Sequence, residues 1–85
     1  MLDHTFIALL QEAAGETLGR ELDGLTLDTP LADLGVDSVG LLEMVGVIED
    51  RLGMRLADDQ IARIVTVRDI LTLVNRGSAT DPRPG

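Results

Sequence analysis

Ser38 is the residue whose type and position in the sequence could support a chemical role. It follows Asp37 and opens a segment whose apolar residues recur at helical spacing, so we expect its hydroxyl at a helix N-terminus. Serine is common there as a helix cap, but Asp37 can cap the helix instead and leave the Ser38 hydroxyl free. The unpaired N–H groups and positive dipole end of a helix N-terminus also suit a phosphate ester. Two interpretations are therefore open: a plain helix cap, or an attachment point for a phosphorylated group.

A nucleophilic serine is a third interpretation. The run from Gly35 to Gly40 superficially resembles the Gly-x-Ser-x-Gly elbow of serine hydrolases, but its first glycine stands one residue too early. That elbow also needs a preceding strand, and none is predicted. His4 is the only histidine and lies in the N-terminal segment, with nothing evident to hold it near Ser38. The sequence has no cysteine, and we expect neither catalysis nor a metal site.

The composition limits the partners. The 85 residues are expected to form one small domain, and 15 acidic against 7 basic residues give a net charge of −8. Nucleic acid and anionic membrane surfaces are disfavoured, because both are bound through lysine and arginine. Partners with basic docking patches are favoured, since complementary potentials steer encounter. No apolar run reaches the ~20 residues that span a bilayer and no signal peptide is evident, so we expect a cytoplasmic protein. We also expect a monomer.

The predicted fold class is all-α: a small four-helix bundle with a long ordered loop between the first two helices. Apolar residues keep helical spacing almost throughout, and no segment alternates as a strand does. The predicted helices are residues 3–18, 38–52, 58–64 and 66–77. The expected N-caps and stops are Asp3, Asp58, Thr66 in a capping box with Asp69, and the glycines Gly19, Gly53 and Gly77. The folded domain is predicted at 1–77, with a disordered polar tail at 78–85.

The loop at residues 19–37 is expected to be ordered, because a structureless stretch of this length is rare in a compact domain. The residues expected to pack onto the core are Leu22, Leu25 and Leu27. Thr29 is then expected to cap a short helical turn that begins at Pro30 and ends at Gly35.

A family resemblance is carried by residues 34–39. Their sequence, Leu-Gly-Val-Asp-Ser-Val, resembles the Asp-Ser-Leu signature of acyl carrier proteins, with Val39 in place of leucine. Residues 41–52 are similar to the second helix of that family, 56–59 to the start of its third helix, and 64–67 to the start of its fourth. The resemblance covers about residues 5–75 at the expected spacings.

The resemblance implies a covalent cofactor. A phosphopantetheinyl transferase would use coenzyme A to esterify the Ser38 hydroxyl with 4'-phosphopantetheine, at a site flanked by Asp37 and Val39. The thiol of this arm would hold acyl groups as thioesters and present them to a ketosynthase, an acyltransferase or another acyl-processing enzyme. The chemistry would belong to the arm and to these partner enzymes.

The resemblance also implies a docking surface on the second helix. Its acidic residues are Glu43, Glu49 and Asp50, with Asp58 and Asp59 close by on the third helix. The predicted core stripe of this helix is Leu41, Leu42, Val45, Ile48 and Leu52. That stripe leaves Val39, Met44 and Val47 for the apolar part of a docking surface. A solvated helix face without a partner is the alternative interpretation of the charges.

Two glycines of the second helix stand out. Gly40 occupies a position where fatty-acid carriers usually have an acidic residue, and Arg51 interrupts the acidic run further along. Gly40 and Gly46 together cost about 2 kcal/mol of helix propensity relative to alanine. We hypothesise that Gly46 makes room for an acyl chain or for close helix packing. The second helix has fewer acidic residues than is usual in fatty-acid carriers, which favours a carrier of a specialised pathway such as polyketide synthesis. Separately, the chain ends suggest a free-standing protein.

Two alternatives remain beside the acyl carrier. A peptidyl or aminoacyl carrier shares the fold and the arm, but such carriers typically have the sequence Gly-Gly-x-Ser at the attachment site. This chain has Gly35 and Val36 in place of the two glycines. A helical interaction module without a cofactor would explain the acidity and the apolar stripes. It would not explain a long ordered loop that ends in Asp37 and Ser38.

Overall fold

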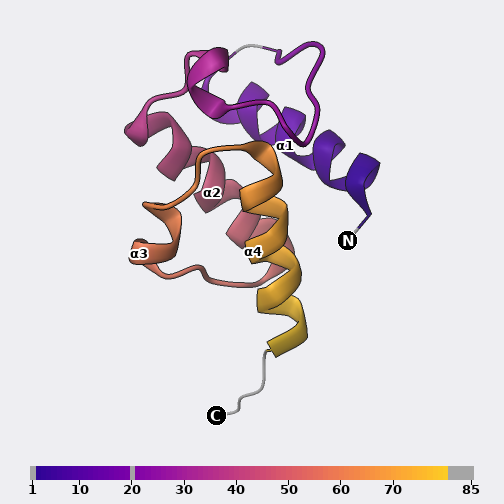
Figure 1. Ribbon diagram of the computed structural model, residues 1–85, viewed down its shortest axis with the longest axis vertical. Helices are drawn as coiled ribbons and strands as arrows, with labels where there is room; N and C mark the ends of the chain where they lie inside the picture. Colours follow the sequence, from indigo (N-terminus) through magenta and orange to yellow (C-terminus); the bar gives the residue numbers. More distant parts are fainter. Residues whose placement is uncertain (1, 20, 81–85) are drawn as a thin grey trace.

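The computed structural model describes residues 2–19 and 21–80, and it is helical as the sequence predicts. The helices are α1 (Asp3–Thr17), the 3₁₀ turn η1 (Leu31–Leu34), α2 (Ser38–Leu52), α3 (Asp58–Ile61) and α4 (Val67–Thr80). The only β pairing among the described residues is an isolated bridge between Pro30 and Thr66. The connection from α1 to α2 arches over one end of the molecule and returns beside the start of α4 (Figure 1).

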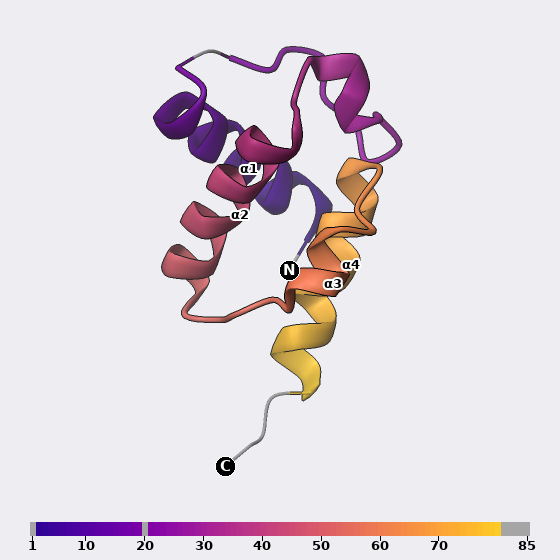
Figure 2. The same ribbon diagram turned by 90° about the vertical axis from the view of Figure 1, so that its left-hand side faces the viewer.

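One apolar core holds these helices together. The largest fully buried side chains come from three of them: Phe6 and Leu10 from α1, Met44 and Ile48 from α2, and Ile70 from α4. Figure 2 shows α1 and α2 on one side of the molecule and α3 with α4 on the other. No polar or charged side chain among the described residues is buried. Hydrophobic burial is therefore the main source of stability for the bundle.

The described residues of the loop between α1 and α2 are ordered, as predicted. Its apolar residues Leu22, Leu25 and Leu27 are buried in the core. The backbone carbonyls of Leu27 and Thr29 accept hydrogen bonds from the N–H groups of Arg68 and Val67, at 2.7 and 3.1 Å. These two N–H groups belong to the first turn of α4, where a helix has no internal acceptors for them. The loop thus provides acceptors for the first N–H groups of α4, and the same hydrogen bonds hold the loop in place.

The prediction that Thr29 caps the η1 turn is wrong. Pro30 is the N-cap residue and is extended, with no side-chain cap. Pro30 is extended because its backbone lies in the bridge to Thr66, so it does not take the first helical position. The Thr29 hydroxyl instead accepts the N–H of Thr26 at 3.0 Å and closes a local turn. Gly35 ends η1 in the left-handed region at φ 73°, as expected.

Several predicted helix ends differ from the structure. Asp3 and Asp58 are the first residues of α1 and α3, and the N-cap positions belong to Leu2 and Ala57. At α3 the Gln60 side chain accepts the N–H of Ala57 at 3.1 Å, and the helix ends at Ile61. Helix α4 continues through Gly77 to Thr80, so the predicted stop is wrong. Residues 81–85 of the predicted tail lie outside the described residues.

The inward face of α2 is rotated from the predicted stripe. Met44 is fully buried, whereas Leu42 is 53% exposed. Met44 and Ile48 lie one turn apart near the centre of the buried face, and Leu42 lies about 160° around the helix from Met44 and about 120° from Ile48. The expectation that Met44 lies off the core stripe and contacts partners is therefore wrong. Met44 contributes to the core and Leu42 to the surface.

The capping box at the start of α4 is confirmed. The Thr66 hydroxyl accepts the N–H of Asp69 at 3.3 Å, and the Asp69 carboxylate accepts the N–H groups of Thr66 and Val65 at 3.0 and 2.9 Å. The hydrogen bond from the Thr66 backbone, followed by that from Val65, lowers the pKa of Asp69 from its ordinary value of 3.8. The charged form of Asp69 is therefore stabilised by folding.

The environment of Gly46 contradicts the close-packing hypothesis. A Cβ built at this residue meets no heavy atom within 4 Å outside its own helix. Close packing therefore does not require a glycine here, and Gly46 brings the propensity cost of glycine. We expect Gly46→Ala to raise the free energy of unfolding by about 1 kcal/mol and Tm by roughly 4–8 °C. Thermal unfolding followed by circular dichroism measures this change, and a lower Tm would contradict the open environment.

The lowered pKa of Asp69 predicts how stability changes with pH. A depressed carboxyl pKa contributes stability that is fully present above the ordinary value of 3.8 and is lost as pH falls through the folded-state pKa. Asp69→Asn should therefore be less stable than the wild type at pH 7 in urea unfolding. The difference between the two proteins should shrink as pH is lowered below 3.8. A difference that stays constant down to pH ~2 would show that the carboxylate charge has no such role.

Candidate functional site

Ser38 is the first residue of α2, and its side chain is exposed. Asp37 precedes it as the N-cap, in an extended conformation. The Asp37 carboxylate accepts the N–H of Gly40 at 2.8 Å, which caps the helix. Asp37 therefore does the capping that Ser38 could have done, which is one of the possibilities that the sequence leaves open, and the helix is capped without the Ser38 hydroxyl.

The turn before Asp37 sets where α2 begins. Gly35 takes the left-handed conformation that lets the chain leave η1, and its N–H donates to the carbonyl of Ala32 at 3.1 Å. The next N–H, of Val36, donates to the carbonyl of Leu31 at 3.2 Å, and the Val36 side chain packs against the core. These contacts fix the chain on the core just before Asp37.

An apolar groove of about 550 Å³ opens beside Ser38. Leu31 of η1, Leu41 of α2 and Ile61 of α3 line it, together with Ile64 from the connection to α4. Its polar side chains are Asp37, Ser38 and Asp58. Ser38 thus stands between solvent and an apolar space formed by three elements of the fold.

Exposed apolar side chains surround this region. Leu42 and Val65 line the groove and are 53% and 62% exposed, and Val39, beside Ser38 in sequence, is 64% exposed. Apolar side chains this exposed are common singly, but three around one site mark a surface that can contact another molecule. Leu42 and Val65 were missed by sequence reasoning. The rotation of α2 brings Leu42 to the surface, and no pattern in the sequence reports that rotation.

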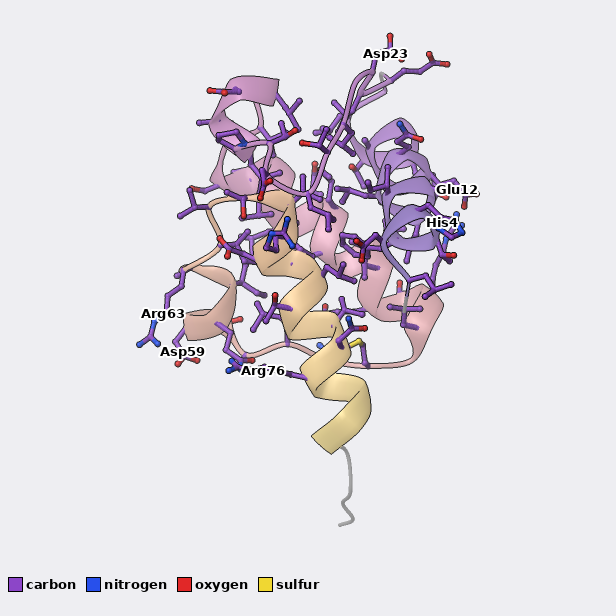
Figure 3. The ribbon with its side chains drawn as sticks, turned by 45° about the vertical axis from the view of Figure 1, so that its right-hand side comes forward. His4, Glu12, Asp23, Asp59, Arg63 and Arg76 are labelled. Atoms are coloured by element: carbon purple, nitrogen blue, oxygen red, sulfur yellow. The ribbon has the colours of Figure 1, made fainter. Side chains whose placement is uncertain are left out.

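The predicted acidic docking residues separate into two groups. Glu43, Glu49 and Asp50 line a second groove, of about 590 Å³, together with Gly46 and Val47 of the same helix. Asp58 lies at the groove beside Ser38, and Asp59 projects outward from α3 near Arg63 (Figure 3).

The acidic residues of α2 also differ in exposure and in hydrogen bonding. Glu43 and Asp50 are exposed, whereas the half-buried Glu49 accepts the N–H of Leu56 at 2.7 Å and so supports the connection to α3. Arg51 reaches across to α1 and pairs with Glu12 and Glu16. The arginine that interrupts the acidic run therefore links α2 to α1.

The surroundings of Ser38 do not build a hydrolase site. His4 is exposed on α1, on the opposite side of the molecule from Asp59 and α3 (Figure 3). No histidine lines the groove beside Ser38, and the carboxylate of Asp37 is engaged in the hydrogen bond from the Gly40 N–H.

In the described part of the chain no group of three or more His, Cys, Asp or Glu residues could hold a metal ion. None of the helices there is long and apolar enough to cross a bilayer.

The described part of the chain is thus a small helical bundle with an exposed serine at a helix N-terminus, beside an apolar groove. Residues 8–74 match the family model described as "Phosphopantetheine attachment site". The chain therefore belongs to the phosphopantetheine-binding acyl carrier family. Members of this family carry acyl groups on a covalently attached 4'-phosphopantetheine arm, and this protein is accordingly a carrier and not an enzyme.

Its relatives include acyl carrier proteins of polyketide synthases. The chain is 42% identical over 66 residues to the actinorhodin polyketide synthase acyl carrier protein of Streptomyces coelicolor, covering 78% of this chain and 77% of that one. It is 42% identical over 71 residues to the granaticin polyketide synthase acyl carrier protein of Streptomyces violaceoruber, covering 84% of each.

Solved structures of acyl carrier proteins are similar in fold to this chain. The acyl carrier protein of Thermotoga maritima is similar with a TM-score of 0.86 at 27% identity, covering 91% of both chains. The hexanoyl actinorhodin carrier of S. coelicolor is similar with a TM-score of 0.79 at 35% identity, covering 96% of this chain and 95% of that one.

The Asp37 cap gives a prediction for stability. Asp37→Ala removes the acceptor for the Gly40 N–H and should lower the free energy of unfolding by about 1 kcal/mol. Asn is an equally good N-cap, so Asp37→Asn should retain most of this stability. Urea unfolding of the two variants beside the wild type provides the comparison. Equal losses in both variants would mean that the charge of Asp37, and not its capping oxygen, stabilises α2.

Proposed function

We propose that Ser38 is the residue that carries the phosphopantetheine arm and that the protein presents acyl intermediates to the enzymes of a polyketide synthase. The observation that supports the attachment point is the division of roles at the start of α2. Asp37 caps the helix, so the exposed Ser38 hydroxyl is free to form an ester. The names of the relatives support the polyketide assignment, and they favour an acyl cargo over an aminoacyl one.

The residues at this site fit a phosphodiester. The N–H groups of Ser38 and Val39 are the first two of α2 and have no acceptor within the helix. Together with the positive end of the helix dipole, they suit the negative charge of a phosphodiester on the Ser38 oxygen. In the transfer, the Ser38 oxygen forms the new bond to phosphorus, 3',5'-ADP leaves from coenzyme A, and the hydroxyl proton goes to a base of the transferase.

The groove beside Ser38 gives the arm and its cargo a place to lie. The arm supplies a thiol that holds acyl groups as thioesters. Leu41 and Ile61 provide apolar walls that can shelter an acyl chain from water, and the groove is open enough to release it to an enzyme. Burial of chain methylenes there contributes about 0.8 kcal/mol each. This modest gain per methylene allows shelter without permanent capture.

The partners follow from the exposed residues around the arm. A phosphopantetheinyl transferase, a ketosynthase and an acyltransferase are expected to use basic patches that meet Glu43 and Asp50, the exposed acidic residues of α2. Val39 and Leu42 add apolar contacts near Ser38, and Asp58 adds a charge on the other side of the groove. The protein acts as a cytoplasmic monomer in this proposal.

Intact-mass analysis tests the attachment point. After incubation with coenzyme A and a promiscuous phosphopantetheinyl transferase, the wild type should gain one phosphopantetheine and Ser38→Ala none. Ser78 is the only other serine of the chain, so Ser78→Ala is the matched control and should load as the wild type does. Loading of Ser38→Ala, or no loading of the wild type, would refute the proposal.

A further inference from the structure

Arg51 is the only basic residue of α2, and it lies in the last turn of the helix. Its guanidinium pairs with the carboxylates of Glu12 and Glu16 on α1. The side chains of Arg51, Glu12 and Glu16 are 39%, 60% and 50% exposed. Exposed ion pairs contribute little to stability, and both helices already share the apolar core. The main effect of Arg51 is therefore on the charge of the surface.

Arg51 reaches one wall of the acidic groove of about 590 Å³ that α2 forms with the end of α1. The charged residues that line this groove are Glu16, Glu43, Glu49, Asp50 and Arg55. Two of its carboxylates are already engaged: Glu16 pairs with Arg51, and Glu49 accepts a backbone N–H of the connection to α3. Glu43 and Asp50 are exposed, and the side chain of neither pairs with another described residue. Glu43 and Asp50 are therefore the carboxylates that a basic partner can engage.

Arg51 also makes the negative charge of this surface uneven along α2. Glu12, Arg51 and the groove residues comprise five acidic and two basic side chains, a net charge of −3. A neutral residue in place of Arg51 would leave Glu12 and Glu16 unpaired, and the acidic surface would continue from Glu43 onto α1. Arg51 instead weakens the attraction for basic groups at the end of α2, about 20 Å from Ser38 along the helix.

We propose that Arg51 is a specificity-determining residue of the docking surface: by pairing with Glu12 and Glu16 it withholds two carboxylates of α1 from basic partners. Partners whose basic groups meet Glu43 and Asp50 are retained, whereas a partner whose basic patch continues onto α1 loses its further contacts. The proposal rests on docking at α2 in the proposed function. Specificity is a difference between two affinities, so a residue that lowers only the affinity for the extended basic patch contributes to it.

Titration of the isotope-labelled protein with a hexa-arginine peptide, followed by NMR, tests the proposal without the arm. The peptide is an extended basic strip of about 20 Å, which is close to the length of α2. At roughly 0.05 M salt, Arg51→Gln should bind it about threefold more tightly than the wild type, because Glu12 and Glu16 become available. The perturbed amides lie around Glu43 and Asp50 in the wild type and should extend to the end of α1 in the variant.

Three further variants identify the cause. Arg68→Gln is the matched control, because Arg68 also forms an exposed ion pair, with Asp28, and lies on α4, on the other side of the molecule from α1 and α2 (Figure 2). It changes the net charge by the same amount and should keep the wild-type Kd within about 1.5-fold. Arg51→Lys keeps the charge and should also keep the wild-type Kd. Adding Glu16→Gln to Arg51→Gln restores the local charge and should return the Kd toward the wild-type value.

The outcomes separate this proposal from the proposed function. Equal Kd values for Arg51→Gln and Arg68→Gln overturn the role of Arg51 and leave the proposed function standing. A threefold difference that persists at roughly 0.5 M salt, where the Debye length is about 4 Å, also overturns it, because charge would not be the cause. Perturbations in the wild type that miss α2 overturn docking at α2 and the role of Arg51 with it. Attachment at Ser38 is measured separately, by intact mass.

Discussion

The hydrogen bond from the Gly40 N–H to the Asp37 carboxylate is the interaction on which the site depends. It sets the first residue of α2 at Ser38 and so decides which side chain caps the helix and which is left for chemistry. The packing of α2 against the core then sets which of its faces is exposed. Met44 and Ile48 are directed into the core, and Leu42 and Glu43 remain on the surface near Ser38. The cap thus places Ser38 at the helix start, and core packing places the exposed side chains around it.

The second constraint is the exchange of backbone hydrogen bonds between the long loop and the start of α4. The loop carbonyls accept the first N–H groups of α4, and the N–H of Leu31 donates to the carbonyl of Val65 at 2.9 Å. This pairing holds η1 against the connection from α3 to α4, and these two segments form part of the groove beside Ser38. The groove is therefore a product of backbone pairing, while its walls can remain apolar and its mouth open.

Much of this arrangement could be predicted from the sequence, because it depends on local patterns. The bounds of α2, the cap at Asp37, the buried leucines of the loop and the capping box of α4 all follow from residue spacing and capping chemistry. The identity of the exposed face of α2 could not be predicted. Leu42 and Met44 are both apolar, and only the packing of α1 and α4 against the helix decides which of them is buried.

The surroundings of the two helix glycines could also not be predicted from the sequence. Gly40 and Gly46 look equivalent in the chain, and both cost helix propensity. Only the structure distinguishes them, because Gly40 is buried near Leu18 and Asp37 whereas Gly46 lies at an open position. The Thr29 turn was mispredicted for a similar reason: a long-range bridge to Thr66 holds Pro30 extended and overrides local capping.

A carrier of this kind contributes position and surface, and the arm and the partner enzymes contribute reactivity. The central claim is that a single side chain, Ser38, holds the arm. Peptide mapping of the loaded wild-type protein tests it most directly: cleavage after arginine yields the peptide of residues 21–51, which contains Ser38 beside Thr26 and Thr29. Tandem mass spectrometry should place the whole phosphopantetheine adduct on Ser38. An adduct on either threonine, or on a different peptide, would contradict the account.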